Sequence, residues 1–324
     1  MKTNDDLLRQ IESDLSLHAP YVKGKNNQIR NCWHFYTDGN VVDSMFNNDQ
    51  DFIDGMNRVY AVWKRHRIVI LAFCLMDTHL HFILYGDFDK CNSFMHEYTK
   101  ITSRHISIKY NDKQKLCRLP INYQQIDNDY YLKTAIAYVI KNPPVAGIGF
   151  CPWDYPWGTG SMYFRKRGYW TLSHSHKDIT TKLSDMTYRE RRKLLKSDIA
   201  DNADDLCVEV FCGIVSPFEY VSWEIVEKIF RSHRAFNYFM CITKEEDIES
   251  KGGSISRLSI PIQEMRQLRD DLCKELFGVA TIRTLDTNNR LKLAKTLRAN
   301  YNCSLKQIAR LCGLVHNELN GIIR

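Results

Sequence analysis

The 324-residue sequence lacks long apolar runs and an apolar amino-terminal segment. No stretch approaches the roughly 18 uninterrupted apolar residues that a membrane-spanning helix needs. The opening residues, Met1 to Asp6, do not form the hydrophobic core of a signal peptide. These two absences disfavour a membrane-embedded or secreted class and predict a cytoplasmic location.

Cysteine pairs at metal-binding spacing are also absent. The sequence holds eleven cysteines, an odd number, and none of them forms a Cys-x-x-Cys motif. Disulfide frameworks and zinc knuckles both need regular spacing, whereas these cysteines are scattered and several have apolar neighbours. We therefore expect reduced, mostly buried thiols that take no part in the chemistry.

The composition is that of an ordinary globular protein, with 44% hydrophobic and 26% charged residues. The length is enough for two domains, or for one domain with an appended helical region. The net charge of +7 is modest but uneven, because residues 281–324 carry eight Lys and Arg residues against two acidic ones. A basic excess confined to one region favours a nucleic-acid partner for that region.

Two histidines flank one leucine inside the apolar run 75–84. Side chains alternate between the faces of a strand, so His79 and His81 point the same way while Leu80 points to the opposite face. Two imidazoles roughly 7 Å apart on one face make half of a metal site. The alternative interpretation is a purely structural histidine pair.

A second chemical pattern lies in the predicted helix 130–144, which two prolines should stop. Tyr138 and Asn142 are four residues apart and therefore share one helix face, within about 6 Å of each other at Cβ. Because Pro143 disfavours the helical conformation of the residue before it, we expect Asn142 in a frayed last turn. Its amide oxygen should there be able to reach a metal, beside an exposed phenol.

Together these residues resemble a known family. His79-Leu80-His81 on a strand, followed by Tyr138-x-x-x-Asn142-Pro143 on a helix, is similar to the single-tyrosine HUH transposases, in particular the REP-associated tyrosine transposases. The resemblance covers roughly residues 30–165 and includes further matching segments in the same order, namely 35–39, 46–51, 146–147 and 155–161.

The sequence departs from the family pattern in two places. Asp77-Thr78 stands before the histidines where these transposases commonly have Pro-Asn, and Pro143-Pro144 stands where a single Pro-Val is usual. The first departure affects the local turn and the DNA contacts expected near it. Neither departure removes a candidate metal ligand or the candidate nucleophile.

The order of predicted elements agrees with a ferredoxin-like (split βαβ) core. Hydrophobic patterns predict strands at 32–37, 68–76, 78–85 and 119–125, with helices starting at Asn48 or Asp49 and spanning 92–110. Strand, helix, strand, strand, helix, strand is the order of an α+β sandwich with an antiparallel sheet. A following helix can lie across the sheet and bring Tyr138 toward the histidines.

The resemblance implies a specific chemistry. His79, His81 and Asn142 would hold Mg²⁺ or Mn²⁺, and Tyr138 would attack a DNA phosphate to leave a 5′-phosphotyrosine link and a free 3′-OH. The implied substrate is single-stranded DNA next to a hairpin. Within the same region Tyr123, Tyr130 and Tyr131 are rival nucleophiles, but none has a ligand-type residue one helical turn ahead. A second histidine pair, His174 and His176, lies in a polar run and predicts a solvated loop.

The remaining sequence predicts two further regions after a core at 1–165. Residues 166–255 read as a helical connector, with a continuous helix expected over 221–239, and residues 256–324 as a basic helical domain. Residues 304–323 resemble a helix-turn-helix, with Ser304 as N-cap, Gly313 in the turn and a second helix at 316–323. This pattern predicts contacts to duplex DNA from Lys292, Lys295, Arg298, Lys306 and Arg310.

Several alternatives remain open at this stage. A non-catalytic, domesticated relative would hold hairpin DNA without cutting it. A ferredoxin-like RNA-binding module would need exposed aromatic pairs on the sheet in place of the histidines. A plasmid or viral replication initiator is disfavoured because no nucleotide-binding Gly-rich loop is present. Monomer and homodimer are both compatible with the sequence.

Overall fold

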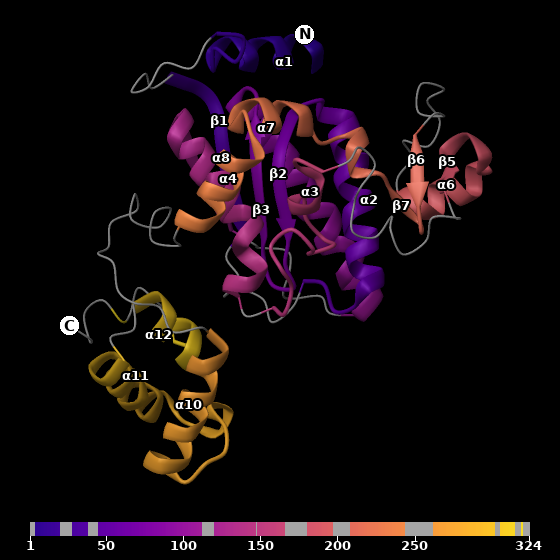
Figure 1. Ribbon diagram of the computed structural model, residues 1–324. Coiled ribbons are helices and arrows are strands. Elements are labelled where there is room, and N and C mark those ends of the chain that lie inside the picture. Colours follow the sequence, from indigo (N-terminus) through magenta and orange to yellow (C-terminus); the bar gives the residue numbers. More distant parts are fainter. Residues whose placement is uncertain are drawn as a thin grey trace. The chain divides into compact units, whose positions relative to one another are not determined.

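The computed structural model describes residues 4–19, 28–37, 45–111, 120–146, 148–165, 180–196, 208–243, 262–301, 305–314 and 319 (Figure 1). The chain divides into two compact units. The first comprises residues 1–143 and 150–245, and the second comprises residues 144–149 and 246–324. The three regions predicted from the sequence remain a prediction, and each compact unit is described by itself.

A four-stranded antiparallel sheet forms the centre of the first unit. Its strands lie in the order β2-β3-β1-β4, and each strand is antiparallel to its neighbours. The strand bounds are β1 Gln28–Thr37, β2 Val69–Leu75, β3 Leu80–Tyr85 and β4 Ile121–Asn128. Helix α2 (Asp49–His66) connects β1 to β2, and α3 (Phe88–Tyr110) connects β3 to β4. The fold is therefore α+β with the predicted order of elements.

Local signals explain where α2 begins and ends. The side chain of Asn48 accepts a hydrogen bond from the backbone nitrogen of Asp51 and caps the first turn. Arg67 adopts a left-handed conformation at the other end, and its backbone nitrogen donates to the carbonyl oxygen of Trp63. Between these caps, apolar residues at helical spacing are buried, among them Met56 and Val59.

The register of the sheet places aromatic residues in a row on one face. Four residues lie side by side across the strands: Phe73, Phe82, Phe35 and Tyr123. Phe82 meets Phe94 and Tyr98 of α3, with ring centroids 5.7 and 5.6 Å apart. This face is therefore the main apolar core, and α3 packs against it.

The next row of residues points to the opposite face because strand side chains alternate. That row contains Cys74, His81, Tyr36 and Asn122. Helix α4 (Asp129–Val145) lies over this face, since the ring of Tyr138 meets the ring of His81 at 5.5 Å. The histidine row is thus covered by the helix that carries Tyr138.

The outer edge of β2 is paired with segments from later in the chain. The backbone nitrogen of Leu75 donates to the carbonyl oxygen of Trp157, and that of Ser222 donates to the carbonyl oxygen of Ile70. The hydroxyl of Tyr155 donates to the carbonyl oxygen of Leu75 at 2.8 Å. A side chain at Gly160 would place its Cβ 2.5 Å from the carbonyl oxygen of Pro152, so this close packing requires glycine.

Helix α4 does not stop where the sequence predicted. It continues through Pro143 and Pro144 to Val145. The two prolines lack the backbone donors that would reach the carbonyl oxygens of Val139 and Ile140, yet the helix continues through them. The prediction of a frayed end at Asn142 was wrong, and Asn142 is buried.

Residues 178–250 are not all helical, contrary to the prediction. They include a second antiparallel sheet, with strands β5 Thr180–Lys182, β6 Glu209–Phe211 and β7 Ile214–Val215, and the helix α6 Tyr188–Leu195. The expected helix over 221–239 is two helices, α7 Trp223–Phe230 and α8 His233–Ile242. Arg231 takes a left-handed conformation between them, and Ser232 caps α8.

The side chain of Asn57 on α2 forms two hydrogen bonds to the small β5–β7 sheet. Its Nδ2 donates to the carbonyl oxygen of Gly213 at 2.8 Å, and its Oδ1 accepts from the backbone nitrogen of Val215 at 2.9 Å. Figure 1 shows α6 and β5–β7 beside α2. The amide of Asn57 thus forms hydrogen bonds with the backbone at the turn between β6 and β7, as a neighbouring strand would.

The amino-terminal helix α1 (Asn4–Asp14) packs on the first unit through Leu7 and Ile11, and the hydroxyl of Tyr85 donates to the Asp14 carboxylate. Short 3-10 turns complete the elements at Gly160–Met162, Leu183–Asp185, Pro217–Glu219 and Ile282–Thr284. Among the helices that the structure describes, none is both long and apolar enough to cross a bilayer.

The second unit is a small helical bundle. Its helices are α10 Ile262–Phe277, α11 Thr287–Tyr301 and α12 Leu305–Cys312, around a core that includes Cys273, Leu293, Leu297, Ile308 and Leu319. Gly313 has a φ of 60° after α12, as a turn of a helix-turn-helix requires. Of the predicted second helix over 316–323, only Leu319 falls among the described residues, where it is helical and buried.

The eight cysteines within the described ranges are free thiols, and five of them are buried. The burial of most of these cysteines agrees with the prediction. The second histidine pair, His174 and His176, lies outside the described residues.

Replacing Asp51 by Asn should lower the free energy of unfolding by about 2–3 kcal/mol, because a buried carboxylate is lost from three partners. It accepts from Lys109 Nζ at 2.6 Å, from the hydroxyl of Tyr110 and from the backbone nitrogen of Asn47. Asp49→Asn, on the exposed first turn of the same helix, is the matched control and should cost less than about 1 kcal/mol.

The effect of Asp51→Asn should depend on pH. Burial acts to raise the pKa of Asp51, but the bonds from Lys109, Asn47 and Tyr110 hold it below its ordinary value. A lowered carboxyl pKa stabilises the fold above the unfolded-state value of about 3.9, and this contribution disappears as the pH falls through the folded-state value. Urea unfolding at pH 7 and at pH 3 measures both effects. An equal cost at the two pH values would contradict an ionised Asp51.

Candidate functional site

Side chains from three elements of the first unit meet on the histidine face of the sheet. The ring of Tyr138, from α4, lies edge-on to His81 of β3 at 5.5 Å and to His34 of β1 at 5.8 Å. The rings of His79 and His81 are 5.0 Å apart. Asn142, one turn after Tyr138, is 3.1 Å from Nε2 of His79 through its Oδ1. The structure therefore brings all four predicted residues together.

Neighbouring polar groups fix the position of His79. Strand β3 begins at Leu80, so His79 lies in the turn just before it, and its carbonyl oxygen accepts from the backbone nitrogen of Met76 at 2.8 Å. Because Oδ1 of Asn142 can only accept, Nε2 of His79 carries the proton of that bond. Nδ1 of His79 then accepts from the Thr78 hydroxyl at 3.0 Å. Thr78, one of the departures from the family pattern, thus contacts the first histidine directly.

The amide of Asn142 is oriented toward the histidines from a buried position. Its Oδ1 meets His79, whereas its Nδ2 finds no hydrogen-bond partner among the described residues. Two adjacent ligands of one Mg²⁺, each at about 2.1 Å from the ion, lie about 3 Å apart. The 3.1 Å between Nε2 and Oδ1 matches that spacing, so these two atoms fit a pair of ligands to one cation.

The donor set itself is uncharged and small. Within the described ranges, no three or more His, Cys, Asp or Glu side chains form a group that could hold a metal ion. A cation at this site would therefore depend on the Asn142 amide as its third protein ligand, beside His79 and His81. Such an open, neutral set leaves positions for water and phosphate oxygens.

His34 is a residue of this site that sequence reasoning missed. Its Nε2 lies 3.0 Å from Nδ1 of His81, and both side chains are buried. Burial lowers the pKa of His34 to about 3, so its imidazole is neutral. The signal was present in the alternation of β1, which puts His34 and Tyr36 on one face, but it becomes readable only when β1 is paired with β3.

The rival tyrosines occupy different surroundings. Tyr130 is 54% exposed and its ring meets Phe239 of α8, and Tyr131 is buried. Tyr123 is on the opposite face of the sheet, where it meets Phe88 at 4.7 Å. The ring of Tyr138, in contrast, meets the rings of His34 and His81.

The predicted DNA-binding residues belong to the second unit. Lys292 and Lys295 are exposed on α11, Arg298 is half-buried on the same helix, and Arg310 is exposed on α12. Lys306 belongs to α12, but its side chain lies outside the described part. Arg269 and Arg290 have structural roles, since they donate to the carbonyl oxygens of Leu311 and Leu285.

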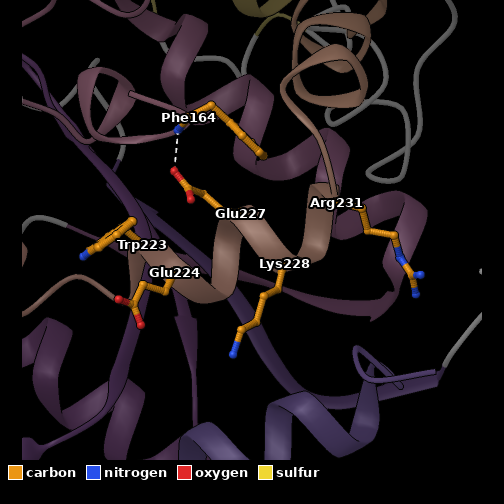
Figure 2. Close-up of a pocket in the computed structure, with 6 residues that line it drawn as sticks. All are labelled: Phe164, Trp223, Glu224, Glu227, Lys228 and Arg231. Atoms are coloured by element: carbon orange, nitrogen blue, oxygen red, sulfur yellow. Dashed lines mark hydrogen bonds between the residues drawn. The ribbon is translucent and has the colours of Figure 1, made fainter. Parts of the chain in front are cut away.

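A separate, open hollow lies on α7 and has no catalytic pattern. Figure 2 shows its lining residues, Phe164, Trp223, Glu224, Glu227, Lys228 and Arg231. The Glu227 carboxylate accepts from the backbone nitrogen of Phe164 at 2.6 Å, and Lys228 pairs with Glu12 at 2.5 Å. Because these charges are used inside the protein, the hollow offers little to a ligand.

Comparisons with known proteins give limited information. No protein-family model and no curated protein matches the sequence. A solved structure of a REP-associated tyrosine transposase bound to a REP hairpin is 15% identical, with 44% of this chain and 82% of that chain covered and a TM-score of 0.31. A likeness at that score decides neither the fold nor the function.

Proposed function

We propose that this protein is a metal-dependent, single-tyrosine HUH endonuclease and strand transferase, a transposase that cuts single-stranded DNA beside a hairpin. The observation that supports this most is the convergence of Tyr138, His79, His81 and Asn142 on one face of the sheet. A nucleophile, two neutral nitrogen donors and an amide oxygen are the groups that a phosphate displacement of this kind needs.

The proposed fold of the core is ferredoxin-like. The strand order β2-β3-β1-β4 and the succession of β1, α2, β2, β3, α3 and β4 support a split βαβ sandwich. In this arrangement one face of the sheet packs on the connecting helices, and the other carries the histidines under α4. The nucleophile thus approaches the ligands from a separate element.

In the proposed reaction, the phenol oxygen of Tyr138 gives up its proton to water and bonds to the phosphorus of the scissile phosphate. The bond from phosphorus to the 3′ oxygen breaks, and that oxygen takes up a proton to become a 3′-OH. The other DNA end stays linked to the protein as a 5′-phosphotyrosine. Attack by another 3′-OH on this link reverses the step and joins two strands, without an external energy source.

His79, His81 and Asn142 would hold the cation, Mg²⁺ or Mn²⁺, which when bound supplies polarisation of the phosphate and offsets its developing charge. For Nε2 of His79 to bind a cation, the ring must carry its proton on Nδ1. The Thr78 hydroxyl can then accept a hydrogen bond from Nδ1 instead of donating one. His81 likewise can donate from Nδ1 to the neutral His34 and keep Nε2 for the ligand role.

Two further parts of the proposal concern partners. A tyrosine on a covered sheet face reaches a phosphate in an unpaired strand more easily than in a duplex, which favours single-stranded DNA. The exposed basic residues of α11 and α12, with the turn at Gly313, support binding of the hairpin stem by the second unit. A homodimer stays a prediction.

The test is incubation with single-stranded hairpin oligonucleotides from the DNA flanking the protein's own gene, with Mn²⁺ or with a chelator, followed by a denaturing gel. The proposal expects a slower-migrating protein–DNA adduct that needs the metal. If the protein binds the hairpins equally well with chelator and forms no adduct or cleaved strand, a non-catalytic hairpin-binding protein becomes the better account. Tighter binding of RNA than DNA would favour the RNA-binding alternative.

A further inference from the structure

A row of cations lies on α6, outside the region that resembles the transposase family. Arg189, Arg192 and Lys193 are all exposed, at positions i, i+3 and i+4 of the helix. This spacing puts them on one helix face, within about a third of the circumference. We call these three residues the α6 cationic face.

The rest of α6 explains why this face is turned outward. Leu195 is buried, about 110° around the helix axis from the middle of this face, and α6 contacts α2. Arg191 is directed to the protein, since its Nη1 donates to the carbonyl oxygens of Leu183 and Met186. Arg191 and Leu195 thus turn toward the protein, and the three residues of the cationic face stay exposed.

A single negative charge on α6 stands against the three positive charges of this face. Glu190, the only acidic residue of the helix, is used at its start, where its carboxylate accepts from the backbone nitrogen and the hydroxyl of Thr187. This capping box fixes the carboxylate at the amino-terminal end. The three cations thus face solvent together.

The helix dipole accounts for part of this arrangement. Cations in the last turn are favourable there, which is a structural reason for Arg192 and Lys193. Arg189 stands in the first turn, where the dipole disfavours a positive charge, and it also lies next to both other cations. The helix dipole and the neighbouring cations therefore do not favour a positive charge at Arg189.

We infer that the α6 cationic face binds the phosphate backbone of DNA that flanks the hairpin. The inference rests on the proposed function for its substrate. Three like charges on one side of a helix form a compact positive surface that complements adjacent phosphates of a strand, and such contacts carry no sequence information. Tyr188, 44% exposed at the start of α6, lies beside them, with its hydroxyl 3.3 Å from Nη1 of Arg192.

The experiment compares two double substitutions in the full chain. Arg189→Gln with Lys193→Gln removes one arginine and one lysine from the face at i, i+4. Lys100→Gln with Arg104→Gln removes the same two charges at the same spacing from exposed positions on α3 and is the matched control. Fluorescence anisotropy then measures the dissociation constant for a labelled hairpin with long flanks at several NaCl concentrations.

Each lost phosphate contact should reduce the magnitude of the slope of the logarithm of the association constant against the logarithm of the NaCl concentration by about 0.9. We expect a slope smaller by about 1 to 2 and a roughly tenfold weaker dissociation constant for the α6 variant, with little change for the α3 control. The charge-preserving pair Arg189→Lys and Lys193→Arg should keep both values, which separates charge from folding.

Equal slopes for the α6 variant and the wild type, equal losses in both double variants, or no binding of flanked hairpins by the wild type would each overturn the inference. Its failure is distinguishable from failure of the proposed function, because the readout is binding and needs no cleavage. If the α6 variant changes the slope but the wild type forms no adduct, the cationic face binds DNA and the proposed catalytic function fails. If the wild type forms the adduct but the α6 variant leaves the slope unchanged, the catalytic function stands and the inference about the cationic face fails.

Discussion

Tyr138→Phe should abolish the covalent protein–DNA adduct, with a fall in its rate of formation of at least roughly 10³-fold. Phenylalanine keeps the ring that packs edge-on to His34 and His81, so the fold and the histidine contacts should stay intact. Only the attacking oxygen is lost. The measurement is the amount of metal-dependent adduct over time on a denaturing gel, with the flanked hairpin as substrate.

Tyr130→Phe is the matched control for this change. Tyr130 lies two turns earlier on the same helix, is exposed, and has its ring against Phe239. It should form the adduct at the wild-type rate. Loss of the adduct in Tyr130→Phe with its retention in Tyr138→Phe would reassign the nucleophile to Tyr130. Retention in both variants would contradict both assignments.

His81→Ala should lower the rate of adduct formation by about 10²- to 10³-fold, since several kcal/mol of charge stabilisation depend on a bound cation. His81→Ala should also weaken the binding of Mn²⁺ in the absence of DNA. Electron paramagnetic resonance measures this binding from the signal of the free Mn²⁺ ion. The rate of adduct formation and the affinity for Mn²⁺ should fall together because both depend on the His81 imidazole.

Two controls separate the ligand role of His81 from its place in the core. His96→Ala, on an exposed position of α3, should leave the adduct rate and Mn²⁺ binding unchanged. His81→Gln keeps most of the buried volume, so it should unfold near the wild-type temperature and still bind Mn²⁺ weakly. Unchanged Mn²⁺ binding in both His81 variants would show that His81 is not a ligand.

The parts of the site that the sequence predicted are the parts encoded locally. Strand alternation predicted that His79 and His81 share a face, although His79 lies just before β3, and one turn of helix relates Tyr138 to Asn142. The resemblance to a family then linked the two pairs. Their meeting depends on α4 lying over the histidine face, which the order of elements predicted. The metal and the roles of these residues remain predictions.

His34 could not be found in the same way, because its partner is distant in sequence. Its importance depends on the register in which Tyr36 lies opposite His81, and strand register is set by the pairing of two separated segments. The sequence around His34 does not show which residue it will face. Without the strand register, the simpler interpretation of His34 is a buried histidine with a structural role.

The errors in the middle of the chain have similar physical causes. Strands of two or three residues, such as β7 Ile214–Val215, are too short for alternation to appear in the sequence. The break between α7 and α8 occurs at Arg231, where neither glycine nor proline marks a helix end. Helix α4 runs through two prolines in its last turn although each removes a backbone donor, so proline did not mark the helix end there.

Contacts between α4 and α8 have a consequence for the modularity of the chain. Lys141, next to Asn142, donates from Nζ to the carbonyl oxygen of Thr243 at 2.7 Å, and Tyr130 meets Phe239 at the other end of α4. The helix that carries the candidate nucleophile is thus braced at both ends by residues some hundred positions later. A shortened chain that keeps only residues 30–165 would lose these contacts, so we expect the smallest stable version of the first unit to extend at least through α8.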